Sequence, residues 1–139
     1  MTYRASNTYL ENRILGASPL ELVVILYEEA DRSVRDALMA LSQGDIRKRA
    51  REITRVQLIL SELAASLDLQ AGGELASRLA DLYSYMQGRL TTAHIEQSPG
   101  PLEETSRILA TLLEGWRECA GQERKERQAH EATEVVQAF

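Results

Sequence analysis

The sequence predicts an all-α protein, an antiparallel four-helix bundle with a short N-terminal cap helix or segment. Three observations support this fold class. The 139 residues are 44% hydrophobic but only 5% aromatic, and Leu, Ala, Glu and Arg, which favour helix, are the commonest residues. Apolar residues recur at alternating spacings of three and four, as they do along the seam of a bundle. Short connections separate the apolar stretches, which implies antiparallel neighbouring helices.

The first long helix is expected over residues 18–42, after a cap segment over residues 1–17. Ser18 can be its N-cap, Pro19 suits the first helical position, and Glu21 completes a capping box. The residues of the following run LVVILY point all round the helix axis, so they form a second apolar face that the bundle seam does not bury. Some other apolar surface must pack against it. The seam consists of Leu20, Val23, Tyr27, Ala30, Val34, Ala37 and Leu41.

The second long helix is expected over residues 45–68. Gly44 can end the preceding helix in a left-handed conformation, and Asp45 can cap the new one. Its predicted seam consists of Ile46, Ala50, Ile53, Gln57, Leu60, Ala64 and Leu67, widened by Val56, Ile59 and Leu63. Its first half carries a basic run, Arg47, Lys48, Arg49, Arg51 and Arg55, in which Arg47, Arg51 and Arg55 share one face. We interpret this as a solvated face, with a salt-sensitive acidic contact as the alternative.

The third and fourth helices are expected over residues 73–95 and 101–120, so that the bundle spans 18–120. Gly88 lies inside the third helix, where close approach of another helix is one explanation for a glycine. Pro101 suits the first position of the fourth helix. Residues 121–139 have no apolar stripe and form either a polar C-terminal tail or an extension of the helix.

No catalytic residue, cofactor or metal is predicted, and the protein is expected not to be an enzyme. A di-iron bundle needs Glu-x-x-His motifs, but Thr91 stands three residues before His94, and Arg127 stands three before His130. These histidines and Cys119 do not form a close-spaced zinc signature. A metal-bundle enzyme or a histidine phosphotransfer domain is therefore only an alternative class.

Charge and hydropathy limit the possible partners and location. The net charge of −5 argues against a nucleic-acid partner, which would favour a basic surface. No stretch approaches the about 20 apolar residues that cross a bilayer, and the N-terminus has no apolar leader. We therefore expect a cytoplasmic protein without membrane insertion.

Several helices carry more apolar surface than one bundle seam uses. The excess includes the LVVILY run, Leu58 on the second helix and Tyr85 on the third. Exposed apolar grooves on small domains commonly bind a partner helix. The N-terminal residues Tyr9, Leu10 and Ile14 form a candidate movable cap that covers such a groove until the partner displaces it.

Four stretches, taken in order and spacing, resemble the FliS family of flagellar export chaperones. They are ASPLELVVILYEEA, LSQGDIRKRAREITRVQLILSEL, LDLQAGGELASRLADLYSYMQGRL and LEGWRECA, within residues 3–120. The resemblance implies a cytosolic chaperone that binds the disordered C-terminal region of flagellin in apolar grooves. By the same resemblance, such a chaperone prevents premature polymerisation of flagellin and aids flagellar type III export. Three positions differ from the usual family pattern: Ser84, Gly88 and His94.

The client-binding groove is predicted on the outer faces of the second and third helices, with a contribution from the first. Its candidate residues are Leu22, Leu26, Thr54, Gln57, Leu58, Ser61, Leu75, Leu79, Leu82, Tyr85, Met86 and Arg89. The amide of Gln57 can bond a client backbone, or it can be a satisfied core glutamine. Export gate components or a regulator are further partners that this account allows.

Two alternatives remain open at this point. A helix-binding adaptor for another secretion substrate or a regulator would have the same fold. The same apolar surface could also pair with its copy, so the free protein is expected to be a monomer or a weak homodimer.

Overall fold

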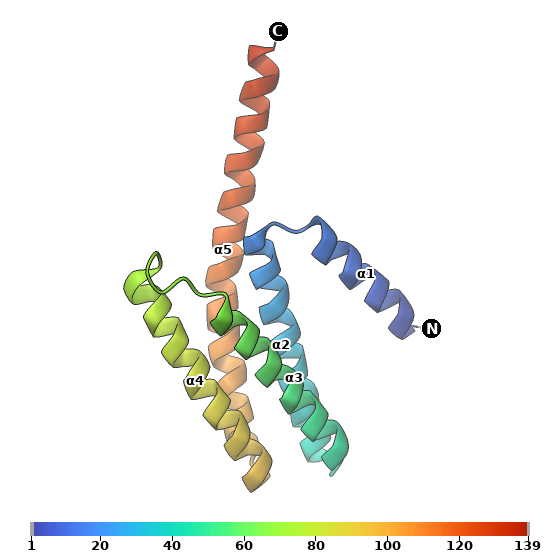
Figure 1. The fold of residues 1–139 in the computed structure, drawn as a ribbon. Helices are drawn as coiled ribbons and strands as arrows, with labels where there is room; N and C mark the ends of the chain where they lie inside the picture. The colour runs from blue at the N-terminus through green and yellow to red at the C-terminus, as the bar shows by residue number, and fades with distance from the viewer. Residues whose placement is uncertain (1, 139) are drawn as a thin grey trace. The chain divides into compact units, whose positions relative to one another are not determined.

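The computed structural model describes residues 2–138, with side chains described from residue 7 onward, and this part of the chain is helical without strands. The helices are α1 (Thr2–Gly16), α2 (Pro19–Ser42), α3 (Ile46–Ala65), α4 (Gly73–Glu96) and α5 (Pro99–Gln137), coloured in chain order in Figure 1. The all-α fold class is therefore confirmed. The chain divides into two compact units, Leu26–Thr111 and the pair of segments Met1–Ile25 and Leu112–Phe139.

The larger unit, Leu26–Thr111, contains the antiparallel bundle. Helices α3 and α4 run in opposite directions, because Arg49 contacts His94 near one end while Ser61 contacts Gln87 further along. The buried side chains come from all four helices of the unit. They include Tyr27, Ala30 and Val34 of α2, Ile53, Val56 and Leu60 of α3, Tyr83, Met86 and Leu90 of α4, and Leu102 and Leu109 of α5.

Two tyrosines meet in the middle of this core. The hydroxyls of Tyr27 and Tyr83 are 2.6 Å apart, and both side chains are almost completely buried. Their rings are tilted, with centroids 6.4 Å apart. The hydrogen bond lets each ring contribute apolar area to the core while its hydroxyl keeps a partner, as a buried polar group requires.

The ends of the helices follow local sequence signals, with one correction. Gly44 has φ 71°, and Asp45 caps α3 by accepting a hydrogen bond from the Lys48 amide at 3.1 Å, as predicted. The prediction that the last helix begins at Pro101 is wrong, because α5 begins at Pro99. Both prolines are tolerated there, since first-turn amides have no partner within a helix.

The predicted seam of α3 is shifted from the observed buried face. The buried residues of α3 are Arg49, Ile53, Val56, Leu60 and Leu63. Ile46 and Ala64, which we placed on the seam, are exposed instead. Because α3 carries apolar residues on a wide arc, the true centre of its stripe lies nearer Val56 than Gln57, and Arg49 completes the stripe at the N-terminal end.

The smaller unit holds α1, the start of α2 and the end of α5. Ser18 accepts a hydrogen bond from the Glu21 amide at 3.2 Å, which is one half of the predicted capping box. The Ser18 hydroxyl also donates to Glu123, and Glu21 accepts from Arg127. The C-terminal residues extend α5 as a helix to Gln137, which is one of the two predicted alternatives.

Gly88 is not explained by a close helix neighbour. A Cβ atom added at this glycine would have nothing within 4 Å, and the residue lies on the exposed side of α4. The close approach suggested from the sequence is therefore wrong. Open space remains above this turn of α4.

Candidate functional site

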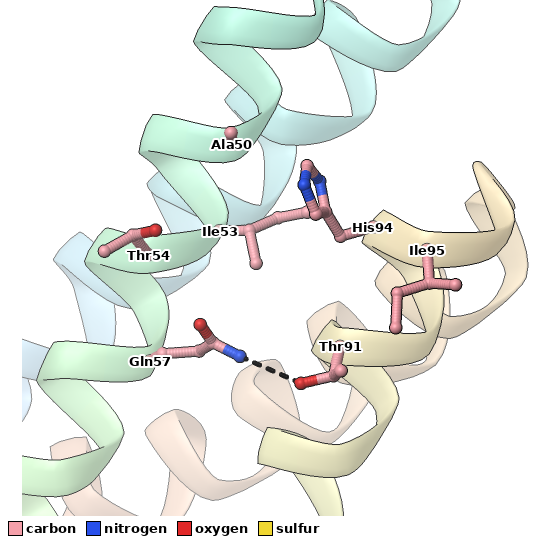
Figure 2. A pocket seen from close by; sticks show the side chains of 7 residues that line it. All are labelled: Ala50, Ile53, Thr54, Gln57, Thr91, His94 and Ile95. Atoms are coloured by element: carbon pink, nitrogen blue, oxygen red, sulfur yellow. Dashed lines mark hydrogen bonds between the residues drawn. The ribbon is translucent and has the colours of Figure 1, made fainter.

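A groove with a volume of about 310 Å³ lies between α3 and α4. Its lining consists of Ala50, Ile53, Thr54, Gln57, Thr91, His94 and Ile95. Figure 2 shows His94 extending from α4 toward α3, and Gln57 and Thr91 reaching toward each other. We call these seven residues the α3–α4 groove.

Neutral hydrogen bonds join the two helices at one end of the groove. The Thr91 hydroxyl donates to the Gln87 carbonyl at 3.2 Å, so its oxygen accepts the bond from Gln57 Nε2, also 3.2 Å away. This fixes the orientation of the Gln57 amide and leaves its Oε1 without a donor among the described residues. Gln87 in turn donates to the Gln57 carbonyl and to the Ser61 hydroxyl.

Behind the other end of the groove, Arg49 contacts His94. The Nε atom of buried Arg49 lies 3.5 Å from Nδ1 of His94, which is half-buried in the groove wall. The guanidinium N–H can only donate, so Nδ1 acts as the acceptor and the imidazole carries its hydrogen on Nε2. His94 therefore offers an N–H donor in the groove, a role the sequence did not suggest.

A second surface lies on α4 toward the start of α5. Leu75, Leu82, Tyr85 and Arg89 follow one another at helical spacing, so they share a face, which we call the α4 outer face. Tyr85 and Arg89 both donate to Glu104 of α5, each at 2.8 Å. The hydrogen bond with Glu104 raises the pKa of the Tyr85 hydroxyl, and the same bond, reinforced by Arg89, lowers the pKa of Glu104.

The structure distributes the predicted groove residues over three environments. Thr54 and Gln57 line the α3–α4 groove, and Leu58 and Ser61 are exposed beside it on α3. Leu75, Leu82, Tyr85 and Arg89 lie on the α4 outer face, and Leu22 and Leu26 are half-buried on α2.

Two of the predicted residues, Leu79 and Met86, are not on the surface. They are buried in the core, because the inward stripe of α4 runs through Ala76, Leu79, Tyr83, Met86 and Leu90. Their predicted assignment to the client-binding surface is therefore wrong, because they belong to the buried stripe of α4.

The sequence missed five of the groove residues, namely Ala50, Ile53, Thr91, His94 and Ile95. The sequence assigns no client-binding role to Thr91 or His94. The sequence feature that could have indicated the groove is that Thr91 and His94 are polar residues three apart on α4, as Thr54 and Gln57 are on α3. Only the register between the two helices shows that the pairs face each other.

The candidate cap residues lie on α1. Tyr9 is 67% exposed and Ile14 is also exposed, whereas Leu10 is half-buried. A movable cap at these positions stays a prediction.

Among the residues that the structure describes, no group of His, Cys, Asp and Glu side chains is placed to hold a metal ion. None of the described helices combines the length and apolar character needed to span a membrane.

Comparison with known proteins points to one family. A family model described as "Flagellar protein FliS" matches residues 1–123. A flagellar secretion chaperone FliS from Salmonella typhimurium is 31% identical over 112 residues, which are 80% of this chain and 83% of the relative. A relative of the same name from Campylobacter jejuni is 34% identical over 119 residues, covering 86% and 93% of the two chains.

A solved structure supports the fold. The crystal structure of a flagellar chaperone from bacteria matches with a TM-score of 0.70 and 18% identity, over 88% of this chain and 99% of the other.

Proposed function

The chain belongs to the FliS family, and we propose that it is a flagellar export chaperone whose client is the disordered C-terminal region of flagellin. The observation that carries this proposal is the family match over residues 1–123, together with curated relatives named as flagellar secretion chaperones. Acting in the cytoplasm, the protein would prevent premature flagellin polymerisation and aid type III export.

Exposed apolar side chains on α3 and α4 support a protein client. Leu58 lies beside the α3–α4 groove, Ile95 lines it, and Leu75 and Tyr85 lie on the α4 outer face; all four are exposed. Apolar residues gathered on the surface of a small domain mark interaction sites. Because the two surfaces lie on different sides of α4, an extended client that wraps round the helix suits them better than a compact one.

The polar groups of the α3–α4 groove support binding of client backbone. Gln57 Oε1 receives no hydrogen bond from the described residues, although the amide is held in place by Thr91. It can accept a bond from a backbone N–H of the client while the walls bury apolar client side chains. A fixed acceptor loses less entropy on binding than a mobile one.

The first test is a calorimetric titration with a peptide of about 40 residues from the C-terminus of the same organism's flagellin, a length that allows a disordered segment to wrap the surface. The proposal expects saturable one-to-one binding with a negative heat-capacity change, because apolar surface becomes buried. No binding at tens of micromolar would contradict the flagellin assignment and favour an adaptor for another secretion substrate or a regulator.

Surface variants locate the binding site. Leu58→Asp and Tyr85→Asp place a charge on the two proposed surfaces and should each weaken peptide binding at least about tenfold. Met39→Asp on α2 is the matched control, since Met39 is an exposed apolar residue outside both surfaces. Circular dichroism should show all three variants folded. Normal binding by both surface variants would show that the client binds elsewhere.

The cap and the free state can be tested with the same peptide. If Tyr9, Leu10 and Ile14 cover part of the binding surface in the free protein, deleting residues 1–16 should tighten peptide binding. Unchanged affinity would remove the cap from the proposal. Sedimentation of the free protein distinguishes a monomer from the weak homodimer that the same apolar surface could form.

A further inference from the structure

Arg49 is an anomaly among the arginines of the larger unit. The ion pairs there join more exposed arginines to carboxylates, namely Arg32 and Arg55 with Glu29, Arg35 with Asp31, Arg78 with Glu74, and Arg89 with Glu104. Arg49 is only 3% exposed, yet no described residue places a carboxylate within 4.0 Å of it. Buried charged groups normally have a counter-charge, and the Arg49 guanidinium has none among the described residues.

The contact that Arg49 does make leaves its charge uncompensated. Its Nε faces Nδ1 of His94 at 3.5 Å, and an imidazole that accepts this bond is neutral. The long distance makes this a weak hydrogen bond. The guanidinium therefore retains a full positive charge, next to an imidazole whose remaining Nε2–H is a donor.

A ligand reaches this pair through His94, because Arg49 is buried and is not among the residues that line the α3–α4 groove. His94 lines the α3–α4 groove, as Figure 2 shows. A ligand in this groove can therefore accept from His94 Nε2 and lie close enough to feel the charge of Arg49.

We propose that the Arg49–His94 end of the α3–α4 groove binds the carboxylate of an acidic side chain, Asp or Glu, in the client segment. This inference rests on the proposed function, because it names a residue class at one position of that client. A carboxylate is the ligand that supplies both an acceptor for His94 and a counter-charge for Arg49. A neutral amide or hydroxyl would supply an acceptor for His94 but no counter-charge for Arg49.

The surroundings define the sequence context of this acidic residue. Ala50, Ile53 and Ile95 give the same part of the groove an apolar lining, so apolar client residues should flank the acid. Arg47 and Arg51 are exposed on the same end of α3 and add to the positive potential there. Arg49, which belongs to the basic run at the start of α3, is thus buried against His94 instead of lying on the solvated face.

The decisive experiment is a double-mutant cycle between the full-length protein and the flagellin C-terminal peptide. Each Asp and Glu of the peptide is replaced in turn by Asn or Gln. One replacement should weaken binding to the wild-type protein about tenfold, the typical loss when a buried charge loses its partner. The same replacement should have little further effect on binding to Arg49→Met, because the interaction is already absent.

Control variants separate this role from a structural one. Arg51→Met removes a charge from the same helix but from an exposed position, and it should change affinity less than about twofold. His94→Phe keeps an aromatic ring at this position and removes the donor, so it should reproduce part of the Arg49→Met loss. Raising NaCl from about 0.1 M to about 0.5 M should weaken wild-type binding more than Arg49→Met binding, because salt screens the attraction.

Several results would overturn the inference. One is that no acidic position couples to Arg49, although the peptide binds. Another is that an Asn, Gln or Ser of the peptide couples instead. A third is that only amidation of the peptide's C-terminus weakens binding, which would assign the carboxylate to the chain end.

A small probe tests the site independently of flagellin. N-acetyl-glutamate N-methylamide should shift the side-chain NMR signals of Arg49 and His94, and N-acetyl-glutamine N-methylamide should not. If the flagellin peptide fails to bind but the glutamate probe shifts these signals, the proposed client is wrong and the carboxylate site stands. Equal shifts with both probes, or none with either, would remove the carboxylate site.

Discussion

Leu58 and Leu60 are two residues apart on α3, yet Leu58 is 64% exposed and Leu60 is fully buried. Tyr85 and Tyr83 differ in the same way on α4, where Tyr85 is exposed and Tyr83 is buried. The inner faces of these helices meet through close apolar packing and one hydroxyl pair, whereas the outer faces carry apolar groups in solvent and polar bonds at their edges. The comparison separates residues that hold the bundle together from residues available to a partner.

The largest expected effect comes from truncating the inner leucine. Leu60→Ala should lower the free energy of unfolding by about 2–5 kcal/mol, because it removes buried methyl groups and leaves a cavity. Leu58→Ala should change stability by less than about 0.5 kcal/mol, since its side chain is already in water. Denaturant unfolding measures both. Equal losses would mean that the outer face is also core, for example within a dimer.

The next effect concerns the two inner tyrosines. Tyr27→Phe leaves the buried Tyr83 hydroxyl without its partner and should cost about 1–3 kcal/mol of stability. The double variant Tyr27→Phe/Tyr83→Phe should cost less than the sum of the two single changes, because it also removes the Tyr83 hydroxyl that Tyr27→Phe alone leaves without its partner. Tyr85→Phe on the outer face is the control and should have a smaller effect. Additive single losses would show that the two hydroxyls do not interact.

The sequence predicts the fold more completely than the binding surface. The caps at Gly44 and Asp45 depend on a few adjacent residues, so local chemistry was enough to place them. The centre of the α3 stripe was misplaced because α3 is apolar over a wide arc, and only contact with its neighbours selects which part of the arc is buried. On α4, Leu79 and Met86 repeat at the spacing of a bundle seam and are buried, so only their assignment to the client-binding surface is wrong.

The α3–α4 groove depends on information that neither helix carries alone. Gln57 meets Thr91, and Arg49 meets His94, only because the antiparallel register brings these turns together. A shift of one turn would pair each residue with a different partner. The basic run of α3 therefore gave no sign that Arg49 turns inward while Arg47 and Arg51 stay exposed.

A smaller effect, of opposite sign, is expected on the exposed side of α4, at Gly88. Gly88→Ala should stabilise the protein by about 1 kcal/mol, because alanine favours helix and its Cβ meets no atom within 4 Å. Gly115→Ala in α5 should do the same, since that glycine also has open space around it. A client that lies over the exposed turn at Gly88 would bind Gly88→Ala less tightly and Gly115→Ala unchanged. Equal affinities would move the client's path away from this turn.

The smallest effect is expected where the outer face of α4 meets α5. Tyr85 and Arg89 lower the pKa of the Glu104 carboxyl, so its contribution to stability is present above the ordinary carboxyl pKa and is lost as pH falls through the lowered value. Glu104→Gln should therefore lower the melting temperature slightly at neutral pH, and the difference from wild type should shrink in acid. Its neighbour Glu103, exposed on the same turn, is the matched control, and Glu103→Gln should leave the melting temperature at neutral pH nearly unchanged. If Glu104→Gln also frees Tyr85 to contact the client, peptide binding tightens while stability falls. A loss of binding would instead mean that the client uses the Tyr85–Glu104–Arg89 arrangement as it stands.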